Sequence, residues 1–518
     1  MYPAILTFIG IAQLRQSLPY AAALFFTLLF IEKQFSSRRL KTLPIPGSAS
    51  WIWGHEKQVF DQSVGMAYLN WMQDLQSHIF RIKAALFKPD IVIVADPFAL
   101  THIMQRNIYN YPHSEVLRLR IARMLGKSLG WVEGEYEHRQ MRHLVTSPLS
   151  QEAVKQGSPE IFNVAENLCT SLESYITQQG GESVIINLHE WTSPVTLDVI
   201  GRFGFGHDFQ GGRSPDAEHI LGAWRSMVKM GVSSQGFIVL MLLRRFTFLN
   251  YIPLKALRSQ GNVRLTIHKG IAEELIRREK GHKQEGYDLL SKLMSAYQAQ
   301  KISLEELKDH TTSQTLSYAL WELSKNPEVQ AKLRRELMAF RSGLSYDDIQ
   351  GRTPYLDAVC KEVLRFHPAG PYMERVASKD DILPLRFPVP MKDGRKVNEV
   401  HIQAGQTVII PIYSIGRDNA IWGDGDIFRP ERWLERLSNE ETMPTGWSGM
   451  LTFSDGPRQC IGRRLAVVEF KILLSCLITK FEFAATQDVF THKVATSLQP
   501  MCEDGGDNPR LPLVVKIL

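Results

Sequence analysis

The pattern of apolar and polar residues along the chain predicts a mostly helical protein. In six segments apolar residues recur every three or four positions, the spacing of one face of an α-helix. Strand-like alternation is confined to two places, 91–94 and 385–412. Runs of helix followed by local hairpins favour a mainly α fold of the α+β class, a large helical body with small sheets. The six helical segments are Glu160 to Gln178, Arg264 to Lys280, Thr311 to Leu323, Pro327 to Phe340, Tyr355 to Phe366 and Leu465 to Phe481.

The N-terminal segment has the pattern of a membrane anchor. Residues 18–31 carry no charge and no amide, and the run reaches the roughly 20 residues of a bilayer span if it starts near Ile11 and Arg15 extends to the interface. Basic residues follow the run, which places the rest of the chain on the cytosolic side. We expect an anchor at 1–32, with an interfacial hairpin as the alternative, a basic, proline-rich hinge at 33–50, and one large domain at 51–518.

Charge and cysteine content narrow the possible functions. Sixty Lys and Arg against 54 Asp and Glu leave a net charge of +6 over 518 residues, which is too dilute to indicate nucleic-acid binding. The five cysteines are odd in number and contain no C-x-x-C pair, so they are expected to be reduced thiols. A cysteine with a special role must therefore owe that role to its surroundings.

Cys460 has such surroundings. It lies between Gly456 and Gly462, just ahead of an apolar helix and beside three arginines. A helix N-terminus and nearby positive charge favour the thiolate, which is either a nucleophile or a metal ligand. A nucleophile needs a positioned base, and no histidine is close in sequence. One thiolate is too few for zinc or an iron–sulfur cluster, whereas heme iron needs a single protein ligand. A buried structural cysteine is a better interpretation of Cys476.

The residues around Cys460 resemble a known family. The motif F-x-x-G-x-R-x-C-x-G, which resembles the heme-binding loop of the cytochrome P-450 monooxygenases, is formed by Phe453, Gly456, Arg458, Cys460 and Gly462. The resemblance implies the fold of that family, with heme b between a long central helix and the helix that follows the cysteine loop. It also implies that the Cys460 thiolate is the axial ligand of the iron.

Other residues match further motifs of the family. Glu362 and Arg365 match its E-x-x-R motif, and residues at i and i+3 share a helix face. The resemblance makes Arg432 the third member of a buried ion network. It also implies that four cations hold the two heme carboxylates, since buried carboxylates need cations; for the first of them, a solvated helix histidine is the alternative. These four are His138, Arg142, Arg375 and Arg458.

The central helix departs from the family pattern. Thr311 and Thr312 match the hydroxyl half of the motif that manages protons for bound dioxygen, but His310 stands in the place of its acid. Polar residues crowd into the positions before Thr311, where a helix buried on all sides is apolar. Either the deduced sequence lacks a short stretch here, or the protein carries a shortened helix. In the second case Asp309 or His310 is expected to act as a displaced proton donor beside Thr311.

The resemblance implies a membrane-bound monooxygenase of the fungal microsomal type, located in the endoplasmic reticulum. It would hydroxylate an apolar small molecule, such as a terpenoid or another secondary metabolite, with O₂ and electrons from an NADPH–cytochrome reductase, with cytochrome b5 as a further donor. The reductase would meet Arg463, Arg464 and Lys471. Residues 109–123 match the roof of the substrate pocket, and 237–254 match a lid that either contacts the bilayer or packs in the core. The alternatives are a heme-thiolate isomerase or dehydratase, and a heme-binding protein without turnover.

Overall fold

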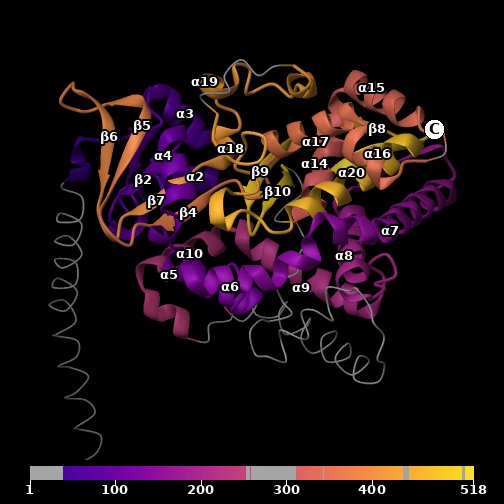
Figure 1. Ribbon diagram of the computed structural model, residues 1–518, viewed down its shortest axis with the longest axis horizontal. Coiled ribbons are helices and arrows are strands. Elements are labelled where there is room, and N and C mark those ends of the chain that lie inside the picture. Colours follow the sequence, from indigo (N-terminus) through magenta and orange to yellow (C-terminus); the bar gives the residue numbers. More distant parts are fainter. Residues whose placement is uncertain (1–38, 253–256, 258–310, 342, 436–442, 504–507) are drawn as a thin grey trace, which may run out of the picture.

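A computed structural model describes residues 39–252, 257, 311–341, 343–435, 443–503 and 508–518 (Figure 1). The expected anchor at 1–32, the expected helix from Arg264 to Lys280, and the two candidate proton donors Asp309 and His310 lie outside these residues. The described part is a helical body with several small sheets.

The helical body is built around α20, which follows the cysteine loop. This helix is buried along most of its length and packs against α7, α14 and α17, because its apolar residues lie on nearly every face. Figure 1 shows α20 in the middle of these helices, with α5, α6, α9 and α10 along one long side of the molecule. The longer helices are α3 (Met66–Asp74), α5 (Glu115–Leu125), α6 (Glu135–Thr146), α7 (Gln151–Gln178), α8 (His189–Phe205), α9 (Pro215–Val232), α10 (Ser234–Arg245), α14 (Thr311–Lys325), α15 (Pro327–Met338), α17 (Pro354–Phe366) and α20 (Arg463–Lys480).

Short helices connect these elements. The π-helix η3 (His102–Arg106) and the 3₁₀-helix η11 (Gly456–Arg458) matter most for function, because η11 lies just before Cys460 and contacts η3. The others are η1 (Arg39–Thr42), α2 (Glu56–Asp61), η2 (Ala85–Phe87), α4 (Pro97–Thr101), η4 (Ile108–Asn110), η5 (Ser147–Leu149), η6 (Thr247–Tyr251), α16 (Tyr346–Gly351), α18 (Ile412–Ile415), α19 (Asn419–Trp422) and η9 (Pro430–Trp433).

Four small sheets accompany the helices. The largest has the order β1-β2-β7-β4, with β2 and β7 parallel and the other neighbours antiparallel, and β4 carries Arg375. The other sheets are the hairpins β5–β6 and β9–β10 and the sheet β3-β11-β8. The strands are β1 (Ile79–Ile82), β2 (Ile91–Val94), β3 (Ser183–Asn187), β4 (Met373–Val376), β5 (Asp381–Pro390), β6 (Lys396–Ile402), β7 (Thr407–Ile410), β8 (Phe481–Ala485), β9 (Phe490–Val494), β10 (Leu498–Cys502) and β11 (Pro512–Ile517).

The expectation that strands are confined to two places is wrong. Strands also form at β1, β3 and β4, and near the C-terminus at β8, β9, β10 and β11. The strand β11 pairs with β3, far away in the sequence, and with β8. Such short segments are stabilised by partners from distant parts of the chain, so their own side-chain pattern does not reveal them.

The proline-rich part of the expected hinge is docked on the body. Leu40 and Leu43 are buried in the core cluster that contains β1 and β2, and the Pro44 carbonyl accepts a hydrogen bond from the Arg81 amide at 3.0 Å. The imidazole of His55 contacts the carbonyl oxygens of Pro46 and Gly47 at 3.1 and 3.2 Å. The chain from Leu40 onward is therefore held in place and does not act as a free spacer.

Among the described residues, no single helix is both long enough and apolar enough to cross a membrane. Taken together, α9 and α10 meet the criteria of length and composition, but they are bent by 78° where they join.

Packing on α20 predicts a stability difference that can be measured. Leu473 is fully buried in α20, so Leu473→Ala is expected to lower the free energy of unfolding by about 2–5 kcal/mol through lost burial and a cavity. Met338, at the end of α15, is 62% exposed. Met338→Ala is therefore expected to change the free energy of unfolding by less than about 0.5 kcal/mol. Denaturant titration of both variants tests this; equal losses would contradict the packing of α20.

Candidate functional site

Backbone hydrogen bonds shape the loop that presents Cys460. The Cys460 amide donates to the Phe453 carbonyl at 2.7 Å, and the Gln459 amide donates to the Gly456 carbonyl at 3.0 Å. Phe453 packs edge-on against Trp447 and joins the hydrophobic core. These contacts fix the backbone on both sides of Cys460 and leave its side chain exposed among the described residues.

Gly456 is required where the loop meets η3. Its φ of +61° is a conformation that other residues rarely adopt, and a Cβ there would lie 2.2 Å from the Met104 carbonyl oxygen. The preceding Asp455 fixes the same contact, since its carboxylate accepts from Gln105 Nε2 at 2.9 Å. Gly462 differs: its backbone is in an ordinary region, and a Cβ there would meet no described atom within 4 Å.

The electrostatic surroundings of Cys460 favour the thiolate. Arg142 on α6 donates from Nη1 to the Gln459 carbonyl at 2.7 Å. Burial lowers the pKa of Arg142 and of Arg463, and attraction to the Cys460 thiolate opposes this lowering in both. Cys460 also lies just before the first turn of α20, whose partial positive charge stabilises an anion.

A second group of cations is buried with unused hydrogen-bond donors. Arg375 is 5% exposed, and its Nε and Nη1 have no acceptor among the described residues; the same holds for Arg458 Nε. Burial, reinforced by repulsion from Arg458, lowers the pKa of Arg375 to about 10. The carboxylate of Glu133 accepts a hydrogen bond from Arg458 Nη2 at 2.9 Å and lies 2.6 Å from His113 Nδ1. Buried guanidinium N–H groups that have no acceptor within the protein indicate that an anion binds beside them.

His138 lies beside these arginines. It is 2% exposed, and its Nδ1 lies 3.0 Å from the hydroxyl of Tyr109. Burial lowers its pKa to about 4, with further contributions from Arg458 and Arg142. The alternative of a solvated helix histidine is therefore wrong. The four residues expected at the carboxylates share one electrostatic environment, since Arg142, Arg375 and Arg458 all act on the pKa of His138.

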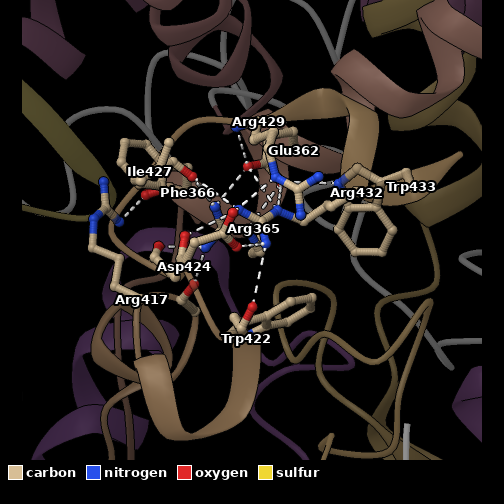
Figure 2. Close-up of polar contacts among 12 residues, drawn as sticks. Glu362, Arg365, Phe366, Arg417, Trp422, Asp424, Ile427, Arg429, Arg432 and Trp433 are labelled. Atoms are coloured by element: carbon tan, nitrogen blue, oxygen red, sulfur yellow. Dashed lines mark hydrogen bonds and ion pairs between the residues drawn. The ribbon is translucent and has the colours of Figure 1, made fainter. Parts of the chain in front are cut away.

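Glu362 is the centre of a buried ion network (Figure 2). Arg365 donates to both of its carboxylate oxygens at 2.9 and 2.7 Å, and Arg432 Nε lies 3.1 Å from both. The indole of Trp433 donates to the same carboxylate at 2.9 Å, and the Arg429 amide does so at 2.7 Å. The side chains of Glu362 and Arg365 have no exposed surface, so every lone pair and donor of this network must be satisfied within the protein.

The network fixes the segments that lead to the cysteine loop. The remaining donors of Arg365 reach the carbonyl oxygens of Gly416, of Gly425 at 2.6 Å and of Ile427 at 2.9 Å. Thr452, just before the loop, donates to the carbonyl of Leu364 on α17 at 2.7 Å. The helix α17 thus contacts the chain both well before and immediately before the Cys460 loop.

Comparison with known proteins decides the family. A model of the family described as Cytochrome P-450 matches residues 44–499, which is most of the chain.

The chain belongs to the cytochrome P-450 family.

Two similar fungal proteins are the cytochrome P-450 monooxygenases claP and claQ of Ampulloclitocybe clavipes. They are 31% and 30% identical to this chain, and each alignment covers 92% of the chain and 94% of the relative. Cytochrome P-450 monooxygenase 205 of Postia placenta is 28% identical over 93% of the chain and 94% of its own length. The fold class expected from the sequence is confirmed, and the chain is an oxidoreductase of the monooxygenase type.

Cytochrome P-450 proteins carry heme b with a cysteine thiolate as axial ligand, and the residues present here fit that group. Cys460 is a suitable ligand for the iron, because its side chain is exposed and its surroundings favour the thiolate. The idle donors of Arg375 and Arg458 fit the two carboxylates of the porphyrin. Cys460 would bind the iron, and His138, Arg142, Arg375 and Arg458 would hold the carboxylates.

The two threonines that resemble the hydroxyl half of the central-helix motif lie at the start of α14. Thr311 is the first described residue of α14 and is exposed, whereas Thr312 is 3% exposed. The helix α14 packs against α8, α17, α20 and the strand β8. The residues before Thr311, where the sequence departs from the family pattern, lie outside the described residues.

Sequence reasoning missed several supporting residues and misplaced one. Glu133, Thr452 and Asp455 were not expected; only Asp455 carries a local signal, as an acid directly before the loop glycine. Lys471 does not belong to a surface for the reductase. It is 3% exposed and pairs with Asp357 at 2.6 Å, whereas Arg464 is exposed.

Breaking the Glu362 network is expected to destabilise the fold. Glu362→Gln leaves the buried guanidinium of Arg365 without a carboxylate and removes one of the two carboxylates that pair with Arg432, which costs about 3–5 kcal/mol. Asp61 forms a half-exposed pair with Lys57, so Asp61→Asn is a matched control with an expected loss below about 1 kcal/mol. Denaturant unfolding measures both. Similar losses for the two variants would contradict a structural role of the network.

The lowered pKa of His138 predicts a pH dependence in the heme-free protein. The folded state resists protonation of His138 until pH falls to about 4, while the unfolded state takes up the proton near 6.5. Stability is therefore lost as pH falls through this window. His138→Gln is expected to flatten the stability profile between pH 6.5 and 4, and His401→Gln, at a half-exposed site, is expected to leave it unchanged. Unfolding curves across pH test this; identical slopes for the parent and His138→Gln would refute it.

Proposed function

We propose that this protein is a heme-thiolate monooxygenase that hydroxylates an apolar small molecule, of the terpenoid or another secondary-metabolite class. One observation carries the proposal: Cys460 is presented at the start of α20 between two guanidinium groups, next to buried arginines with idle donors. Heme bound there would supply the activation of O₂ and the transfer of one oxygen atom to the substrate. The fungal relatives, which are named as monooxygenases, support the same chemistry.

The protein's own residues would perform the remaining tasks. Arg142, Arg463 and the start of α20 would stabilise the thiolate of Cys460. The Glu362 network holds the loop in position through α17. Thr311 and Thr312 would orient the water that delivers protons, and Asp309 or His310 would supply those protons. This assignment of the four residues extends the resemblance and applies to the shortened helix.

Electrons would come from an NADPH–cytochrome reductase, with cytochrome b5 as a further donor. Arg464 is exposed at the start of α20, and Arg463 lies over the ring of Trp447 at 5.7 Å. A basic surface this close to Cys460 suits an acidic face on the reductase.

We further propose residues 1–32 as a membrane anchor, 33–50 as a basic, proline-rich hinge segment whose part from Leu40 onward is docked on the body, and 51–518 as the catalytic domain, with the protein in the endoplasmic reticulum membrane and its catalytic domain in the cytosol. The lid segment supports a membrane contact, since α10 and η6 bury one side and expose large apolar residues on another. Those exposed are Ile238 (43%), Phe248 (62%), Tyr251 (70%) and Ile252 (41%). A lipid surface would cover these exposed apolar side chains and would supply lipophilic substrates to the enzyme.

Replacing the axial ligand tests the proposal. Cys460→Ala is expected to abolish the carbon-monoxide spectrum of the reduced thiolate-ligated heme and all turnover, because no other described residue offers a thiolate at this loop. Cys476→Ala, in the following helix, is the control and is expected to keep both. The parent protein, supplied with a reductase and NADPH, should incorporate one atom of labelled O₂ into its product. Product formed without NADPH and reductase would instead indicate an isomerase or dehydratase.

A further inference from the structure

Two cysteines meet where α7 packs against α20. Cys169 lies on α7 and Cys476 lies on α20, and both are free thiols in this structure. They are 307 positions apart in the sequence, yet their Sγ atoms are 3.0 Å apart. This separation is only about 1 Å longer than a disulfide bond. A small movement of the two side chains would therefore bring the sulfurs to bonding distance.

Neighbouring contacts direct the Cys476 side chain toward α7. Its Sγ donates to the carbonyl oxygen of Ala165 at 3.6 Å, and Ala165 lies one turn of α7 before Cys169. Farther along α20, Lys480 forms an ion pair with Glu166 of α7. Lys480 follows Cys476 by four positions, and Glu166 precedes Cys169 by three, so each pair of residues shares one helix face. The packing of α7 on α20 therefore keeps the two sulfurs facing each other.

The two thiols differ in their access to solvent. Cys169 is fully buried, whereas Cys476 is half-buried at the edge of the same hydrophobic cluster. The contact with Cys476 raises the pKa of the Cys169 thiol, burial raises it further, and the positive charge of Lys480 opposes the rise. A reagent from solvent therefore reaches Cys476 first. Cys169 is placed to react second, with the sulfur of Cys476.

We propose that Cys169 and Cys476 form a reversible redox-modification site, at which a small organic disulfide such as oxidised glutathione converts the two thiols into an intramolecular disulfide. The Cys476 thiolate attacks one sulfur of glutathione disulfide, which forms a mixed disulfide at Cys476 and releases one glutathione thiolate. The Cys169 thiolate then attacks the Cys476 sulfur and displaces the second glutathione. The two thiol protons pass to the two released glutathione thiolates. The protein loses two electrons, and glutathione disulfide gains them.

The disulfide would tie α7 to α20 and stabilise the helical body. It would close a loop across the 307 positions between its cysteines, and cross-linking so long a loop removes much conformational entropy from the unfolded chain. Cys476 lies about 20 Å along the helix axis from the start of α20, so the bond would form away from Cys460. In a reducing cytosol the pair stays as thiols, and it is oxidised when the glutathione pool becomes oxidised.

Mass spectrometry of non-reduced digests tests this site without any turnover. The full-length holoenzyme is incubated with glutathione buffers of increasing oxidised fraction, and free thiols are then alkylated. The parent protein is expected to give a peptide pair linked through Cys169 and Cys476, which an excess of reduced glutathione removes. Cys169→Ala is expected to retain glutathione on Cys476, and Cys476→Ala is expected to leave the buried Cys169 unmodified. Cys360→Ala, at another fully buried cysteine, is the matched control and should keep the linked pair.

Thermal unfolding gives an independent measurement of the cross-link. The oxidised parent protein should unfold about 3 °C or more above the reduced parent. This difference should vanish in Cys169→Ala and in Cys476→Ala and should persist in Cys360→Ala. The site is overturned if the parent forms no linked pair at any glutathione ratio, or if Cys169→Ala carries no glutathione on Cys476. A linked pair that leaves the unfolding temperature unchanged would overturn the stabilising role of the bond.

Discussion

Positive charge buried without an equal amount of negative charge is the constraint on which the site depends. Arg375 and Arg458 hold their guanidinium groups away from water, and three of their nitrogens make no hydrogen bond to the described protein atoms. Burying a charged donor without an acceptor costs more free energy than burying a neutral one. Such groups therefore indicate a ligand that supplies the missing acceptors. They are compatible with the fold when an anion is bound, and a porphyrin with two carboxylates, anchored by Cys460, is an anion of the right chemistry.

The arginines of this protein show how structural and ligand-directed charges differ. Arg365 and Arg432 are as deeply buried as Arg375, but Glu362, Asp424 and backbone carbonyls occupy their donors. That network is complete within the protein and positions the cysteine loop. Arg375 lacks such acids, and two of its nitrogens have no acceptor among the described residues. Structural and ligand-directed arginines differ in how many of their donors have an acceptor within the protein, because both kinds are buried.

Some of this could be predicted from the sequence because the relevant signals are local. The spacing of Glu362 and Arg365 on one helix, and Gly456 ahead of Cys460, are signals of this kind. The strand pattern at 91–94 matches β2 residue for residue. Other features had no local signal. Glu133 reaches Arg458 only through the tertiary fold, and β11 depends on β3 and β8. Lys471 looked exposed from its charge, but Asp357 on α17 draws it into the core.

The beginning of α7 illustrates the same limit on a smaller scale. Periodicity suggests a start at Glu160, but the helix begins at Gln151, because the Ser150 hydroxyl caps the Ala153 amide and Pro159 is accommodated within the helix. Proline in a helix interior usually ends or bends the helix, so the pattern alone favoured the later start.

The central claim, that Arg375 and Arg458 require the carboxylates of the porphyrin, can be measured directly. Heme-free protein is titrated with iron protoporphyrin IX and with its dimethyl ester, in which both carboxylates are neutral. The account predicts that the free acid binds about tenfold or more tightly than the ester, and that this ratio shrinks when Arg375 is replaced by Gln. Equal affinities for the two porphyrins, or a ratio that Arg375→Gln leaves unchanged, would contradict it.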